Sequence, residues 1–306
     1  MSFLESSERL IIMDFGGSVI GRLPPNLLMV DELRALAGVG VKTIYAQGIF
    51  QWDALQPDPD KPIDWSKLDR YVDNIEAGGV KALLPFGYSA PMWKGADWMQ
   101  TYIPDSHMAA APDYTKAKPA QDLDELFSVA AERYRGRPVQ WIYSVPIDGE
   151  FAFPLVSNRS EPDFPVQVFI DWVVARQRLL SAEHGEAWTS FHLIDNPSWA
   201  YELYATFKRE FPDAGLFGIQ FTHWSHEPDA IERVDRMRRD FGALYFCGSE
   251  YSTGLRRFTP QAIKHDCGLL CCPIGLYSGG GRLDELMLED IALSVERFDK
   301  YVHAAR

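Results

Sequence analysis

The sequence has little positive charge and no long hydrophobic run. Lysine and arginine number 30 against 43 aspartate and glutamate residues, which gives a net charge of −13 at pH 7. This acidity argues against a nucleic-acid partner or an anionic membrane surface. No apolar run approaches the length of about 18 residues that a membrane-spanning helix needs, so no membrane span is expected.

Cysteine is also scarce, with four residues at positions 247, 267, 271 and 272. All lie on or beside predicted strands, and adjacent Cys271 and Cys272 would point to opposite faces of a strand. Reduced core cysteines are therefore expected, rather than disulfides or a zinc site. The N-terminus MSFLESSERLIIMDFGG lacks the basic and apolar regions of a signal peptide. A cytoplasmic enzyme is expected, although a domain cut from a longer chain fits equally well.

What the chain does contain is an alternation of short apolar runs with amphipathic segments. The 306 residues show no linker or break in composition, so one domain, 1–306, is expected. Strands alternating with helices predict a parallel sheet. Eight such units in a chain of this length predict an α/β fold, a closed (β/α)8 TIM barrel. The expected strands are 10–13, 41–46, 80–86, 139–150, 187–194, 216–221, 244–250 and 268–276.

The competing fold is an open, doubly wound sheet. It would carry a glycine-rich phosphate loop after its first strand, and Asp14-Phe15-Gly16-Gly17 is not such a fingerprint. We therefore favour the barrel, whose site is built at the carboxyl ends of its strands.

Two of those strand ends carry a glutamate. Val139–Glu150 (VQWIYSVPIDGE) and Tyr245–Gly254 (YFCGSEYSTG) each begin with a buried apolar run and reach one carboxylate, Glu150 and Glu250. An acid at the end of a buried strand is costly unless it has partners or a function. Strands four and seven lie roughly opposite in such a barrel, so the two glutamates predict carboxylate-pair chemistry. A separation of about 5–5.5 Å would support a retaining glycosidase and about 6.5–9.5 Å an inverting one.

The other strand ends carry amides, acids and aromatic side chains, a combination that suits sugar hydroxyls and sugar faces. The long loop 87–119 is rich in aromatic residues and is expected to form one wall of the site. Each candidate has a structural alternative, such as a packed aromatic or a histidine satisfied at the barrel rim. The expected substrate-binding residues are Asp14, Gln47, Trp52, Tyr88, Trp93, His192, Gln220, His223, Trp224, Tyr251 and Tyr277.

Several of these segments resemble the clan A retaining glycoside hydrolases. Val41–Pro57 (VKTIYAQGIFQWDALQP) and Asp64–Val80 are similar to the clan's second strand and the helix after it. Phe86–Trp93 (FGYSAPMW) resembles a loop of family 39 and of related bacterial exopolysaccharide hydrolases. The resemblance implies that Glu150 is the acid/base and Glu250 the nucleophile. The clan usually has asparagine before the acid/base glutamate, where this chain has Gly149.

The sequence therefore predicts a retaining glycoside hydrolase that cleaves a glycosidic bond, β-linked by expectation, in a carbohydrate substrate. No cofactor is implied, and the spacing of the histidines with Asp195 does not support a metal site. Two alternatives stay open. One is a non-catalytic glycan-binding barrel that keeps the aromatic residues, and the other is a different barrel enzyme such as a metal-dependent hydrolase or an aldolase.

Overall fold

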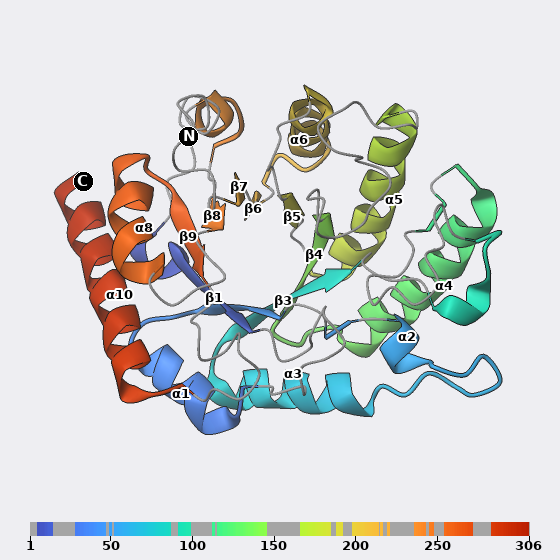
Figure 1. Cartoon of the computed structure of the whole chain (residues 1–306), viewed down its shortest axis with the longest axis horizontal. Coiled ribbons are helices and arrows are strands. Elements are labelled where there is room, and N and C mark those ends of the chain that lie inside the picture. Colours follow the sequence, from blue (N-terminus) through green and yellow to red (C-terminus); the bar gives the residue numbers. More distant parts are fainter. Residues whose placement is uncertain are drawn as a thin grey trace.

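A computed structural model describes most of the chain as one parallel sheet surrounded by helices (Figure 1). The described residues are 5–14, 28–46, 49–50, 52–86, 91–98, 112–113, 115–145, 166–184, 188–191, 198–213, 215–216, 219–220, 236–242, 245–247, 254–271 and 283–305.

Every strand pairing among these residues is parallel, and the strand order is β6-β5-β4-β3-β2-β1-β9-β8-β7. The strands are β1 Leu10–Asp14, β2 Thr43–Ala46, β3 Lys81–Phe86, β4 Val139–Val145, β5 Trp188–Phe191, β6 Gly215–Leu216, β7 Ile219–Gln220, β8 Tyr245–Cys247 and β9 Gly268–Cys271.

The sheet closes on itself through β6 and β7. Strand β6 pairs with β5 at one edge, and β7 pairs with β8 at the other. Leu216 ends β6 and Ile219 begins β7, so the two edges must meet within the reach of two intervening residues. The expected strand 216–221 is thus two short strands with different neighbours, and the expected (β/α)8 barrel is confirmed.

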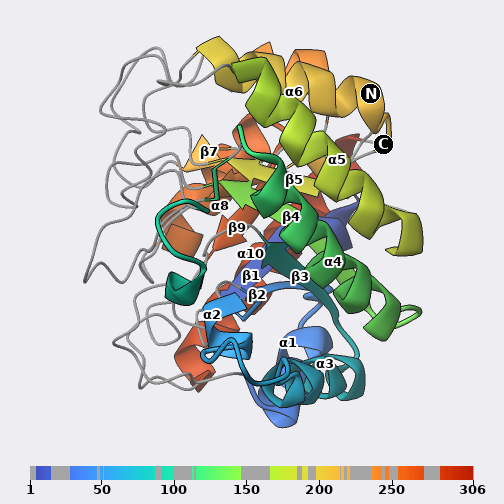
Figure 2. The same ribbon diagram turned by 90° about the vertical axis from the view of Figure 1, so that its right-hand side faces the viewer.

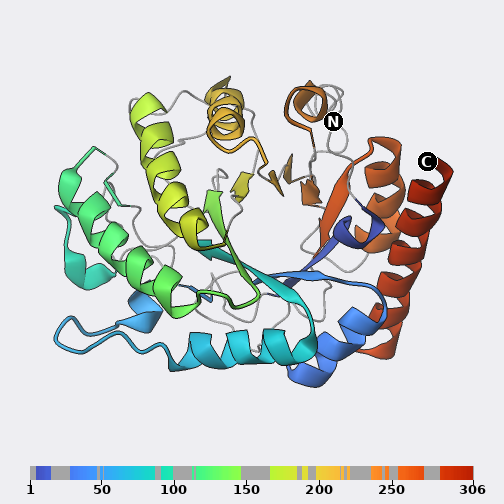
Figure 3. The same ribbon diagram turned by 180° about the vertical axis from the view of Figure 1, so that it is seen from behind.

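Helices cover the outside of the barrel. Figure 2 shows α4 (Ala117–Arg133), α5 (Val166–His184) and α6 (Ser198–Glu210) side by side on one flank. Figure 3 shows α1 (Val30–Gly38) and α3 (Ser66–Gly78) beneath the strands, and α8 (Gly254–Lys264) beside α10 (Glu285–Ala305). The short helix η1 (Ser6–Glu8) precedes β1, and the short helices α2 (Trp52–Leu55) and η2 (Met92–Lys94) lie in the connections after β2 and β3. Residues 236–241 are also helical.

The sequence explains why these helices pack as they do. In α3 the positions Leu68, Tyr71, Val72 and Ile75 recur at helical spacing, and all four side chains are fully buried. The helix ends where Gly79 takes the left-handed conformation with φ of 74°, which glycine adopts without steric cost. This agrees with the helix expected to stop at Gly78-Gly79.

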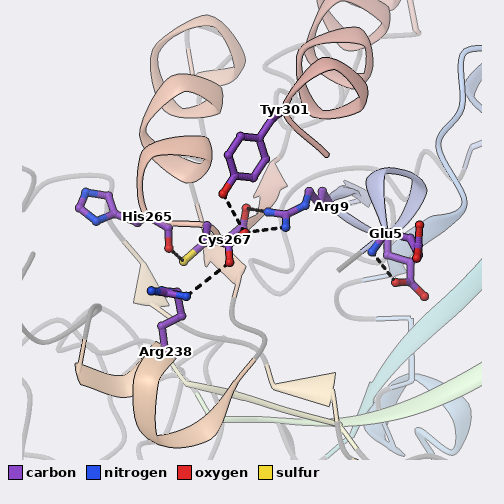
Figure 4. Close-up of polar contacts among 8 residues, drawn as sticks. Glu5, Arg9, Arg238, His265, Cys267 and Tyr301 are labelled. Atoms are coloured by element: carbon purple, nitrogen blue, oxygen red, sulfur yellow. Dashed lines mark hydrogen bonds and ion pairs between the residues drawn. The ribbon is translucent and has the colours of Figure 1, made fainter. Parts of the chain in front are cut away.

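At the amino ends of β1 and β9 a partly buried ionic network ties the strands to two helices (Figure 4). Arg9, whose side chain is 1% exposed, donates to Asp266 at 2.7 Å and to the carbonyl of Cys267 at 3.2 Å. The Tyr301 hydroxyl of α10 donates to Asp266 at 3.1 Å, and Arg238 donates to it at 3.4 Å. We call Arg9, Asp266, Arg238 and Tyr301 the Arg9 network. It lies at the end of the barrel opposite the strand ends that carry the candidate site.

Two of the four cysteines have side chains within the described part of the structure. Cys267 and Cys271 are buried and not part of a disulfide, as expected, and burial raises the pKa of Cys271 to about 12. The side chains of Cys247 and Cys272 lie outside the described residues.

Candidate functional site

The two strands that lead to the glutamates belong to one closed parallel sheet. Counting around the ring, with β6 and β7 as one position, β8 is three positions from β4 in one direction and five in the other. Because parallel strands share one carboxyl edge, both strands run toward the same end of the barrel. Glu150 and Glu250 follow the last described residues of β4 and β8, Val145 and Cys247, by five and three residues. Both glutamates lie outside the described residues, so their separation stays a prediction.

Four of the predicted substrate-binding residues fall within the described part of the chain. Asp14 ends β1, Trp52 begins α2, Trp93 lies in η2 and the backbone of Gln220 ends β7 beside Cys247. The side chain of Gln220 is not among those described. The remaining candidates lie outside the described residues: Gln47, Tyr88, His192, His223, Trp224, Tyr251 and Tyr277.

Asp14 faces the helices. The register places it beside Ala46, on the sheet face that also carries Trp141. Trp141 lies against Tyr134 of the outer layer, with ring centroids 6.3 Å apart. The Asp14 carboxylate is 2% exposed and accepts a hydrogen bond from the backbone of Leu28, just before α1, at 3.1 Å.

The hydroxyl of Tyr71 on α3 interacts electrostatically with the same carboxylate. Burial, and then the charge of Asp14, raise the pKa of Tyr71 well above its usual value. The contacts of Asp14 named here thus hold the β1 end to the helix layer. Hydroxyl binding by Asp14 stays a prediction that these contacts do not favour.

Trp52 and Trp93 meet in a compact aromatic cluster after strands β2 and β3. The Trp52 ring contacts those of Trp93 and Trp98 edge to face, with centroids 6.0 and 5.9 Å away. The Lys94 ammonium lies 4.5 Å from the Trp52 ring centroid, 5.0 Å from that of Trp93 and 5.8 Å from that of Trp98. We call these three tryptophans with Lys94 the tryptophan cluster.

The cluster is anchored to α4 by Asp122. This carboxylate accepts from Lys94 Nζ at 2.6 Å and from Trp98 Nε1 at 2.9 Å, and Lys118 also donates to it. Burial acts to raise the pKa of Asp122, but the hydrogen bonds from Lys118, Lys94 and Trp98 outweigh it and hold the pKa below its usual value. Asp122 is therefore ionised at neutral pH and balances the charge of Lys94.

Hydrogen bonds also fix the neighbouring backbone. Trp93 Nε1 donates to the Gln56 carbonyl at 2.8 Å, and Trp52 Nε1 donates to the Gln56 side chain at 3.0 Å. The backbone N–H of Asp113 donates to the Trp98 carbonyl at 3.0 Å. Residues 98 and 113 are therefore held together, so both ends of the segment between them are fixed to the cluster.

The contact between Lys94 and Asp122 was not predicted from the sequence. One signal was available, because Asp122 interrupts the apolar face of α4 formed by Leu123, Leu126 and Phe127. An acid at such a position needs partners, and one of them is a lysine 28 residues earlier in the chain.

A shallow groove of about 690 Å³ runs along α4, lined by residues between Ala117 and Val129. None of the candidate residues lines it. Among the described residues there is no group of three or more possible metal ligands. No helix in the described part of the chain is long and apolar enough to cross a membrane.

The fold is shared with solved glycoside hydrolases. A β-galactosidase from Rahnella sp. R3 matches all of this chain at 12% identity with a TM-score of 0.64, and one from Marinomonas ef1 matches 94% of it at 11% identity with a TM-score of 0.62. The catalytic domain of a β-amylase from Paenibacillus polymyxa matches 97% of the chain at 12% identity with a TM-score of 0.52.

The chain spans 58% and 59% of the length of the two β-galactosidases and 98% of that of the β-amylase domain. These likenesses establish the fold. No protein-family model and no curated protein sequence matches the chain.

Proposed function

We propose that this chain is a retaining glycoside hydrolase acting by double displacement. The observation that carries the proposal is the pair of strands β4 and β8, which belong to one closed parallel barrel and each lead to a single glutamate. Solved structures with this fold include β-galactosidases, an α-galactosidase and a β-amylase. The resemblance of the sequence to family 39 stays a prediction, since the similar solved structures whose family is stated belong to glycoside hydrolase families 42 and 36.

In the proposed mechanism Glu250 attacks the anomeric carbon while Glu150 protonates the leaving oxygen. The bond to the leaving group breaks and a glycosyl ester forms on Glu250. Glu150, now ionised, removes a proton from water, which attacks the ester and releases the sugar. Glu150 must carry a proton at working pH, so its pKa must be raised by burial or by the charge of Glu250. No cofactor takes part in these steps.

The tryptophan cluster supports a carbohydrate substrate. It places rigid aromatic rings after β2 and β3, at the carboxyl end of the barrel where substrates bind. Sugar rings present C–H faces that stack on indoles. Trp93 is the one tryptophan of the cluster that is only half-buried, so it is the member that we assign to such a contact.

The test is chemical rescue of Glu250→Ala on 4-nitrophenyl glycosides, beginning with the β-galactoside. The variant should fold normally and lose turnover. Azide should restore part of the activity and give a glycosyl azide of inverted configuration, because the anion occupies the space of the lost carboxylate. A Glu250→Ala variant with wild-type turnover would remove Glu250 from the mechanism. A wild-type protein that binds glycans but cleaves none would favour the non-catalytic glycan-binding barrel.

A further inference from the structure

We propose that Lys94 is a positioning residue that sets the orientation of Trp93 in the sugar-binding wall. This inference rests on the proposed function, because it assigns Trp93 to that wall. Lys94 acts through the indoles around it and does not contact the substrate.

The first step is the placement of the lysine charge. The Lys94 side chain is 16% exposed, and its ammonium lies within 6 Å of three indole centroids while it donates to Asp122 at 2.6 Å. A cation held over aromatic faces gains more when it is shielded from water. An ordinary surface lysine would keep its ammonium in solvent, whereas the ammonium of Lys94 lies inside the cluster.

The second step is the set of constraints on Trp93. Its N–H donates to the Gln56 carbonyl, its ring meets the Trp52 ring at 90°, and the Lys94 ammonium lies 5.0 Å from its centroid. Trp52 is 7% exposed and Trp98 is 4% exposed, whereas Trp93 is only half-buried. Trp93 is thus the ring of the cluster that a ligand can reach, and its orientation is fixed before a ligand arrives. A ring that is already oriented binds with a smaller loss of conformational freedom.

The third step is that the charge of Lys94 can be removed without leaving a buried carboxylate alone. Asp122 would keep the Trp98 N–H and Lys118, whose own side chain is 70% exposed. Lys94→Met therefore releases the Trp93 ring from one constraint while Asp122 stays paired. Lys118 has no ring contact in the cluster, so Lys118→Met is a matched control that removes the other lysine of Asp122.

The experiment compares wild type, Lys94→Met, Lys94→Arg and Lys118→Met, with Trp93→Ala as the reference for a lost ring. The kinetic probes are the 4-nitrophenyl β-glycosides of galactose, glucose, xylose and mannose. Dissociation constants for the same glycosides are measured on the Glu250→Ala background. Lys94→Met should raise KM and the dissociation constant about fivefold, a change within the range that cation–π contacts span, with kcat within twofold of wild type. Lys94→Arg should recover most of the loss, and Lys118→Met should match wild type.

A lower melting temperature for Lys94→Met with unchanged KM and dissociation constant would show that Lys94 only stabilises the fold, and would overturn the inference. An equal rise in KM for Lys118→Met would assign the effect to Asp122 and would also overturn it. If Lys94→Met does not fold, Lys94→Gln replaces it, because this change removes the charge over the indoles while keeping a polar group that can still bond to Asp122, and it should raise KM in the same direction.

Failure of the proposed function gives a different pattern. If wild type binds glycosides without cleaving them, double displacement is refuted, and the binding constants of the same variants still decide the role of Lys94. If wild type neither cleaves nor binds any glycoside, both proposals are refuted.

Discussion

Two arginine–aspartate pairs with the same separation allow a direct test of how burial sets the value of an ion pair. Arg9 Nη2 lies 2.7 Å from Asp266 and Arg256 Nη2 lies 2.7 Å from Asp290. The Arg9 side chain is 1% exposed, whereas that of Arg256 is 73% exposed. The perturbation is methionine in place of each arginine, which removes the guanidinium and keeps an unbranched apolar side chain.

The expected losses in the free energy of unfolding differ several-fold. Removing one partner of a buried pair costs about 3–5 kcal/mol, because the other charge and its hydrogen-bonding groups lose their partner. Asp266 would keep Tyr301 and Arg238 and is itself 28% exposed, so Arg9→Met should fall near the lower limit, about 3 kcal/mol. An exposed pair contributes about 0–1 kcal/mol, so Arg256→Met should cost less than about 1 kcal/mol.

The assay is urea unfolding followed in parallel by far-ultraviolet circular dichroism and tryptophan fluorescence. Coincident transitions are needed before the free energies are compared. Repeating the measurement in 1 M NaCl should abolish the small effect of Arg256→Met and leave most of the Arg9→Met effect, because salt screens exposed charges and not buried ones. Equal costs for the two variants would refute the argument that burial of Arg9 makes its network stabilising.

Three further predictions follow from particular residues. Gly78→Ala should lower the free energy of unfolding by about 1–3 kcal/mol, because the new methyl group would lie 2.4 Å from the Leu33 Cβ. Gly38→Ala, whose methyl group would meet nothing within 4 Å, should be neutral or slightly stabilising, and equal urea midpoints for the two variants would contradict this. Hydrogen bonding from Arg133 at the end of α4 lowers the pKa of Asp69. The stabilising contribution of Asp69, measured against Asp69→Asn, should therefore be complete above about pH 4 and lost as pH falls through the lowered pKa. A difference in the free energy of unfolding that grows toward acid pH would have the wrong sign. Glu150→Gln should keep fast glycosylation on activated aryl glycosides and accumulate a covalent adduct that intact-mass measurement detects. Equal losses of activity on substrates with good and poor leaving groups, without an adduct, would exclude Glu150 as the acid/base.

The fold could be predicted because the strands are short apolar runs separated by amphipathic helices. The expected strands 10–13, 41–46 and 80–86 correspond to β1, β2 and β3, with ends shifted by one or two residues. The segment 216–221 shows the limit of this reasoning. Its apolar pattern indicates a strand, but its division into β6 and β7 depends on which neighbours it meets where the barrel closes. That pairing is a long-range property that local pattern does not contain.

The orientation of Asp14 could not be predicted for a different reason. A strand of a parallel barrel is buried on both faces, so Leu10-Ile11-Ile12-Met13 shows no alternation from which to decide the face of the next residue. The registers from β1 to β4 place Asp14 on the face of Trp141, which lies against the helix layer. The pairing of Lys94 with Asp122 was likewise hidden, because it depends on how α4 docks against the connection after β3.

The two ionic clusters lie at opposite ends of the barrel, and this separation gives them different consequences. The Arg9 network joins the amino ends of β1 and β9 to α10 and residues 236–241, and it includes no connection from the carboxyl ends of the strands. Lys94 and Asp122 instead join the connections after β2 and β3 to α4. Because barrel enzymes place their chemistry at the carboxyl ends, a change in the Arg9 network should alter the free energy of unfolding without altering KM. A change at Lys94 should alter KM beyond what its effect on stability explains. We therefore expect the closure of the barrel to be unaffected by changes in the connections after β2 and β3.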